Sequence, residues 1–125
     1  MDWSSLEAIL GPAEKKSADS ITWEKHRPLN VTMNSYSVSG GDVDECFLTF
    51  VRHPKSNRYL VYSEMVGQSH EIGGIVRYLA AMGADISAVH NHWLHTEPSL
   101  MYIHWQIMGS SEAIARAILP LWQSL

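Results

Sequence analysis

The sequence predicts an α+β fold, with a mainly antiparallel sheet and about three helices packed on one face of it. Three observations support this prediction. Apolar residues recur at helical spacing over residues 72–82, and apolar and polar residues alternate over 101–107 as in a half-buried strand. Residues 44–52 and 58–66, rich in β-branched and aromatic side chains, flank a short turn. Together these elements predict a sheet layer covered by a helix layer.

The first predicted elements are a short helix and two strands. Residues 2–10 have apolar positions near helical spacing, and Gly11 ends the helix. Residues 21–27 form the first expected strand. Residues 30–38 form the second, because they are rich in β-branched residues and are followed by the turn sequence SGGD.

A hairpin is the next predicted unit. Its strands are residues 44–52 and 58–66, and the turn HPKSN joins them. Pro54 and Asn57 supply the backbone preferences of a turn. We therefore expect these two strands to pair in an antiparallel manner.

A helix is predicted to begin at Ser69, which is a good N-cap residue. Glu71 lies in the first turn, where the helix dipole favours an anion. Gly83 is expected at the C′ position that ends the helix. One apolar face is traced by Ile72, Ile75, Val76, Leu79 and Met82.

Two strands and a helix complete the chain. The strands are predicted over residues 84–92 and 101–107, and the helix begins at Ser110 or Ser111. Pro120 is expected to kink or end this helix, because proline lacks an N–H group and clashes with the preceding turn. The inward residues of the helix are Ile114, Ile118 and Leu121.

Composition limits the class of protein. The chain has 125 residues, which favours a single domain over residues 1–125, and a net charge of -4, which argues against nucleic-acid binding. No apolar run is long enough for a membrane span, and the N-terminus shows neither a signal peptide nor a lipidation cysteine. The lone Cys46 lies in an apolar run, as expected of a buried thiol. These features favour the cytoplasm.

Histidines are concentrated in the segment VHNHWLHTEP, residues 89–98. His90 and His92 are two residues apart on a predicted strand, so their side chains should point to the same side of the sheet. Two neutral imidazoles in this arrangement can bind one divalent metal such as zinc. The third ligand is expected to be His104 on the next strand or Glu97 in the intervening loop.

The position of His104 depends on the strand register. A slip of one residue would turn its side chain to the other face of the sheet, and the sequence does not fix this register. Glu71 or Glu64 would act as the catalytic base, and Asn91 is a further catalytic candidate. Tyr102 and Trp93 are expected to line a ligand pocket with Glu97.

The histidines allow three classes of function. The first is a metal-dependent enzyme or metal-binding protein, with an open coordination position for water. The second is a metal-free pocket for a small molecule, in which the histidines act as acids and bases. The third is a structural or dimerisation module, in which they form a hydrogen-bond network. The sequence leaves open whether the protein is an enzyme.

Residues 64–120 resemble the LppY/LpqO-type family, bacterial proteins largely of unknown function. The first dozen residues match weakly and residues 12–60 poorly. The resemblance implies a site at the histidines but no reaction. It also implies a homodimer, by analogy with members that carry two such units in tandem. His95 departs from the pattern, which has a small residue there. The matching positions are Glu71, Arg77, Leu79, Gly83, Ala88, His90, Asn91, His92, Glu97, Pro98, Tyr102, His104, Ala115 and Arg116.

Overall fold

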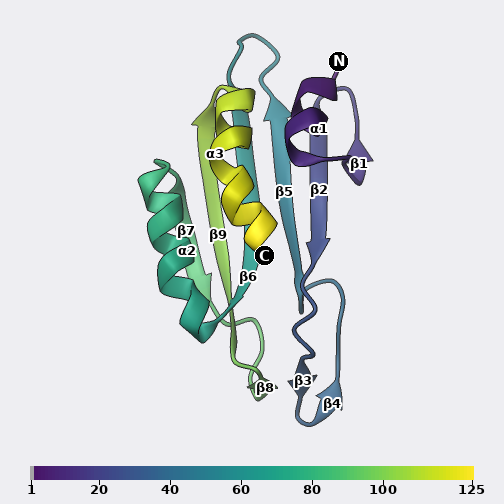
Figure 1. Ribbon diagram of the computed structural model, residues 1–125, viewed down its shortest axis with the longest axis vertical. Coiled ribbons are helices and arrows are strands. Elements are labelled where there is room, and N and C mark those ends of the chain that lie inside the picture. Colours follow the sequence, from purple (N-terminus) through teal and green to yellow (C-terminus); the bar gives the residue numbers. More distant parts are fainter. Residues whose placement is uncertain (1) are drawn as a thin grey trace.

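The computed structural model describes residues 2–125 and confirms the α+β prediction (Figure 1). Within this range, six strands form one antiparallel sheet in the order β1-β2-β5-β6-β9-β7, and three helices pack against it. The helices are α1 (Ser4–Leu10), α2 (Ser69–Ala81) and α3 (Ser111–Ser124). The strands of this sheet are β1 (Lys15–Lys16), β2 (Ser20–His26), β5 (Glu45–Arg52), β6 (Tyr59–Gln68), β7 (Asp85–His90) and β9 (Leu100–Gly109).

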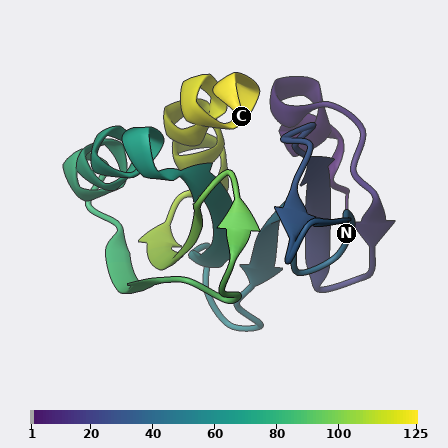
Figure 2. The ribbon, with the colours of Figure 1, turned by 90° about the horizontal axis from the view of Figure 1, so that it is seen from below.

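All described helices lie on the same face of the sheet (Figure 2). The buried side chains of that face alternate along each strand, as expected for a half-buried antiparallel sheet. They pack against the apolar faces of α2 and α3, so one core lies between the two layers. Its members include Ile21, Trp23, Leu48, Phe50, Val61, Met65, Leu79, Ile103, Trp105, Ile114 and Ile118.

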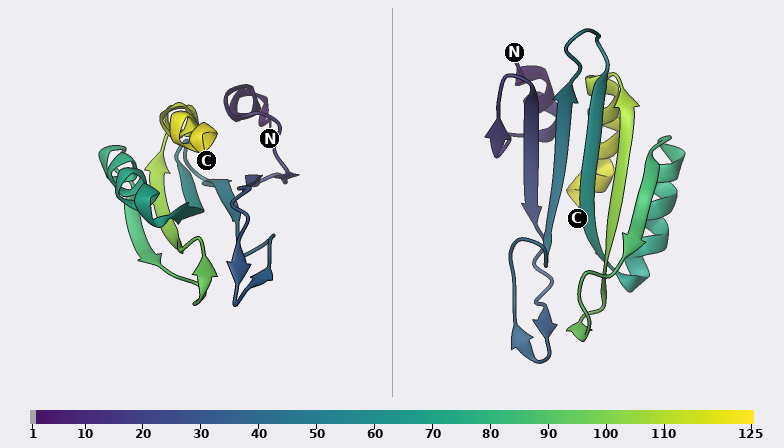
Figure 3. Two further views of the ribbon diagram at one scale, coloured as in Figure 1. Left: turned by 60° about the horizontal axis from the view of Figure 1, so that its bottom comes forward. Right: turned by 180° about the vertical axis from the view of Figure 1, so that it is seen from behind.

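The opposite face of the sheet carries no helix within the described part of the chain (Figure 3). Residues 2–125 include no helix that is long and apolar enough to cross a membrane.

The predicted hairpin is confirmed, because β5 and β6 pair in an antiparallel manner with Phe47 opposite Glu64. β6 also pairs with β9, which places Glu64 opposite His104. β9 pairs on its other side with β7, the edge strand that follows α2. β9 therefore lies between the two strands, with the middle of β6 on one side of it and the end of β7 on the other.

The single strand predicted over residues 30–38 is wrong. This segment forms a small hairpin of β3 (Thr32–Met33) and β4 (Tyr36–Ser37). Asn34 and Ser35 have positive φ angles of 49° and 71°, so the chain turns where a strand would run straight. β3 pairs further with β8 (Thr96–Glu97), which forms a second, three-stranded sheet below the first (Figure 1).

The boundaries of α2 and α3 differ from the predictions in two places. The N-cap of α2 is Gln68 rather than Ser69, because Gln68 and Glu71 form a capping box. α3 continues through Pro120 to Ser124, so the proline does not end the helix, and of the two predicted effects only a kink stays a prediction. Leu121 and Trp122 beyond the proline are buried, and this packing holds the last turn in place.

Gly83 follows α2 with a φ angle of 87°, as predicted for a residue that ends a helix. The next strand, β7, ends at His90 and not at residue 92. His92 therefore lies in the loop after the strand, which changes how it reaches the site.

Candidate functional site

Three histidines from two strands and a loop come together at one end of the sheet. One ligand nitrogen from each of His90, His92 and His104 lies within 4.8 Å of the others. The ring centroids of His90 and His104 are 5.0 Å apart and nearly parallel, and those of His90 and His92 are also 5.0 Å apart. The sequence prediction that these three residues form one cluster is confirmed in its geometry.

The pairing of β7 with β9 explains why His90 and His104 share a face. His90 lies opposite Tyr102, and Ala88 lies opposite His104. Side chains directly opposite one another in a ladder point to the same side, as do residues two apart on one strand. The register that the sequence left open is therefore the one that puts His104 beside His90, on the face without helices.

His92 reaches the cluster from the loop rather than from the strand. Its ring stacks on Tyr102 with a centroid distance of 3.6 Å and an interplanar angle of 7°. Its Nδ1 lies 3.4 Å from the carbonyl oxygen of Asp42. The prediction that His92 lies on the same strand as His90 is therefore wrong. Contacts from the loop that contains Asp42 hold its ring instead.

Hydrogen bonds to the backbone define which ring nitrogens are available. The Nδ1–H of His90 donates to the carbonyl of Asn91 at 3.1 Å, and that of His92 faces the Asp42 carbonyl. A neutral imidazole that donates through Nδ1 presents the lone pair of Nε2 to a ligand. Metal-binding histidines in proteins are oriented by backbone contacts of this kind.

Glu64 brings a carboxylate to the same nitrogens. Its Oε1 lies 3.2 Å from Nε2 of His104 and 3.7 Å from Nε2 of His92, and its side chain is 12% exposed. Nε2 of His104 is buried and has no aligned hydrogen-bond partner within residues 2–125. A buried polar atom in this state has the chemistry to bind a cation or a water molecule.

Tyr102 supports the cluster from below. It is buried, and its hydroxyl donates to the carbonyl of Val43 at 2.7 Å. Burial, with the nearby Glu64 carboxylate, raises the pKa of Tyr102 to about 12. The hydroxyl is thus occupied by the backbone, while the ring face is covered by His92.

The other predicted residues surround the cluster at different depths. The side-chain amide of Asn91 donates to the carbonyl of Leu100 at 2.7 Å and ties the loop to β9. Trp93 is 40% exposed and donates through Nε1 to the Asp42 carbonyl at 3.2 Å. Glu97 is exposed in β8, so the third nitrogen or oxygen donor of the cluster comes from His104.

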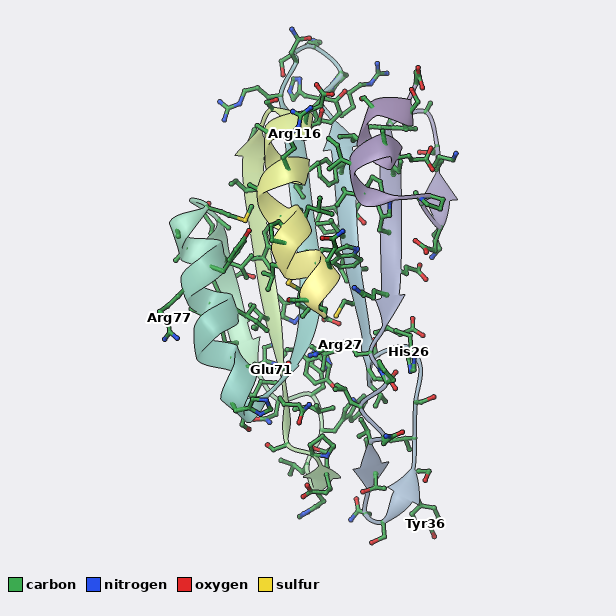
Figure 4. All side chains as sticks on the ribbon, viewed as in Figure 1. His26, Arg27, Tyr36, Glu71, Arg77 and Arg116 are labelled. Carbon is green, nitrogen blue, oxygen red and sulfur yellow. The ribbon has the colours of Figure 1, made fainter. Side chains whose placement is uncertain are left out.

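Glu71 takes part in a different interaction. Its two carboxylate oxygens accept hydrogen bonds from Nη1 and Nη2 of Arg27 at 2.8 and 2.9 Å. Both residues are labelled in Figure 4, near the start of α2. The guanidinium holds the pKa of Glu71 at about 2. This carboxylate links the end of β2 to the start of α2, and both of its oxygens are engaged.

The loop of residues 39–44 contacts His92, Trp93 and Tyr102 through its backbone carbonyls, whereas the sequence predicted only a turn there. The carboxylate of the buried Asp44 accepts hydrogen bonds from the Gly40 N–H at 2.7 Å and faces Nε2 of His26 at 2.9 Å. In the loop held by these contacts, the carbonyl of Asp42 faces His92 and the carbonyl of Val43 accepts the hydrogen bond of Tyr102. Any residue supplies a carbonyl, so only the turn sequence Gly40-Gly41 gave a signal.

Comparison with known proteins gives a family but no activity. A family model described as Domain of Unknown Function (DUF1259) matches residues 4–123, nearly the whole chain. No curated protein and no solved structure matches it.

Proposed function

The chain belongs to the DUF1259 family of domains of unknown function, and we propose that it binds one divalent metal ion through His90, His92 and His104. The observation that carries this proposal is the convergence of three imidazole nitrogens within 4.8 Å. Three neutral imidazoles suit zinc, with copper, nickel and iron as chemically related candidates. The nitrogen ligands of a tetrahedral zinc ion lie about 3.4 Å apart, so small rotations of the imidazole rings would bring the three nitrogens to this separation. The exposed ring of His90 has room for such a rotation.

The donor set fits a site with an open position. Three histidines leave a tetrahedral metal one place for water or substrate. A metal there would polarise a bound water and lower its pKa. Glu64, in contact with two of the ligand nitrogens, is placed either to fill the fourth position or to accept a proton from a water. Glu64 fits this role better than Glu71, whose oxygens are both held by Arg27.

Metal analysis of purified protein tests the proposal. Untagged protein prepared without chelator should contain about one metal ion per chain by mass spectrometry, and the His90→Ala/His92→Ala variant should contain none. His53→Ala is the matched control, because His53 lies in the turn after β5 and not in the cluster. Full metal content in the His90→Ala/His92→Ala variant would show that the ligands lie elsewhere. The metal that is found also decides between zinc and the other candidates.

The resemblance to the LppY/LpqO-type family supports two further expectations, a homodimer and a site that the relatives share. The cytoplasmic location favoured by the composition is a third. Light scattering on purified protein tests the dimer, since a monomer mass of 14.1 kDa would contradict it.

A further inference from the structure

A hollow of about 440 Å³ lies on the face of the sheet without helices, next to the histidine cluster. It extends from Lys15 of β1 across β2 and β5 to Glu64 of β6. Glu64 also contacts His92 and His104, so the hollow and the cluster share a side chain. Its volume is in the range of small-molecule sites, and a ligand in it would end beside the proposed metal.

Two aromatic rings line the floor of this hollow. Phe47 and Tyr62 meet edge to face, with ring centroids 6.0 Å apart. Tyr62 is 41% exposed although it lies on a central strand of the sheet. An exposed ring on the floor of a hollow offers apolar area and a negatively polarised face to a ligand.

The charges that line the hollow are strongly asymmetric. Four carboxylates face one lysine, and the lysine, Lys15, lies 3.0 Å from Glu24 and so compensates that carboxylate. Among the lining residues, Asp42, Glu45 and Glu64 contribute the remaining negative charge. A concave surface with one sign of charge attracts ligands of the opposite sign and repels those of the same sign.

We propose that this hollow binds the substrate of the histidine site, and that it selects a small molecule with an amine and an apolar body. The proposal rests on the proposed metal site, which gives the hollow its reactive end. The ammonium group contacts the carboxylates of Asp42 and Glu45, and the apolar body lies on Tyr62 and Phe47. Ammonium groups are attracted both by carboxylates and by aromatic ring faces, so the two features of the hollow act together.

Three probes with the same phenylethyl body and different charge test the selection: phenethylamine, 2-phenylethanol and 3-phenylpropionate. Each is titrated to about 10 mM into ¹⁵N-labelled, metal-loaded protein while amide shifts are recorded. Phenethylamine should shift amides of β2, β5 and β6 and bind at least about fivefold more tightly than 3-phenylpropionate. Added salt should reduce this preference.

Two variants locate the binding. Glu45→Gln should reduce the preference for phenethylamine, and Tyr62→Ala should weaken all three probes. Glu112→Gln, on α3, is the matched control and should change nothing. Equal binding of the three probes, tighter binding of 3-phenylpropionate, or shifts confined to other parts of the protein would overturn the proposal. Metal content measured on the same samples keeps this result separate, because loss of metal would contradict the metal site and not the charge selection.

Discussion

At the scale of single residues, the site depends on which ring atoms are already engaged. His90 and His92 direct Nδ1 to backbone carbonyls, while Nε2 of His104 is buried beside Glu64 and has no aligned partner among the residues that the structure describes. A cation between these nitrogens would be neutralised in part by Glu64. The carboxylate therefore contributes to affinity whether it binds the metal directly or lies next to it.

Replacement of Glu64 by Gln should weaken zinc binding by about tenfold, because it removes a negative charge beside the ion. Competition with a chromophoric chelator measures this affinity. Glu112→Gln serves as the control, since Glu112 lies on α3. Unchanged affinity in Glu64→Gln would place the ion away from this carboxylate.

Glu71 has a structural effect that depends on pH. Its pKa is lowered from 4.5 in the unfolded chain to about 2 by Arg27, so ionised Glu71 stabilises the folded state above pH 4.5. That stabilisation is lost as the pH falls from 4.5 to about 2. Glu71→Gln should lower the free energy of unfolding at pH 7 by about 2 kcal/mol, a value reduced by partial solvent screening.

Urea unfolding of the wild type and Glu71→Gln at several pH values measures this effect. The difference between the two proteins should be constant above pH 5 and should shrink below pH 4.5. A difference that is the same at pH 3 and pH 7 would assign the stability to another contact of Arg27.

The amino-acid sequence predicted which side chains form the site better than it predicted the backbone contacts that orient them. The three histidines and Glu64 were identified, because imidazole and carboxylate are distinctive ligands. The carbonyls of Asp42 and Val43 were not, since every residue has one. The stacking of His92 on Tyr102 also requires a loop conformation that local spacing does not encode.

At the scale of elements, turn residues and apolar periodicity predicted most of the helices and strands. The hairpin of β5 and β6 and the helix α2 were predicted because turn residues and apolar periodicity lie within a few positions of one another. The hairpin of β3 and β4 was missed, because Asn34 and Ser35 adopt left-handed conformations inside a segment rich in β-branched residues. Pairing of β3 with β8, distant in the sequence, supports this conformation.

Two glycines of the α2 region should respond to alanine in opposite ways. Gly83 has a φ angle of 87°, so Gly83→Ala should lower the free energy of unfolding by about 1 kcal/mol. Gly74 lies inside α2 with open space around an added methyl group, so Gly74→Ala should raise it by a similar amount. Urea unfolding measures both. Stabilisation by Gly83→Ala would contradict the left-handed end of the helix.

At the scale of the whole molecule, the helices bury one face of the sheet, and the histidine cluster lies on the other face. The three histidines are not members of the core between the layers, so replacement of one of them should leave the fold intact. The described part of the chain thus separates the residues that provide stability from those that provide the site. The sequence predicted this layered arrangement, but which strands lie next to each other depends on long-range pairing.

Metal binding should stabilise the whole fold. Zinc at 100 times its dissociation constant adds about 2.7 kcal/mol to the free energy of unfolding, which raises Tm by about 10 °C for a chain of this size. The wild type and His53→Ala should show this increase in thermal unfolding, and His92→Ala should not. An equal increase in all three proteins would mean that zinc binds outside the cluster.

Ser87 is the residue on which the geometry of β7 depends. The ladder to β9 shifts by one position between Ile86 and Ala88, so Ser87 is an extra residue in the strand. If Ser87 instead paired with His104 in a continuous ladder, His90 would lie opposite Met101 and point toward the helices, and the cluster would lose one of its three imidazoles. Relatives that keep this site should therefore vary freely in the identity of residue 87, and a relative without a residue there would keep His90 on the same face through continuous pairing. The face that His90 occupies is thus set by an interruption of the ladder, and not by the type of residue at that position.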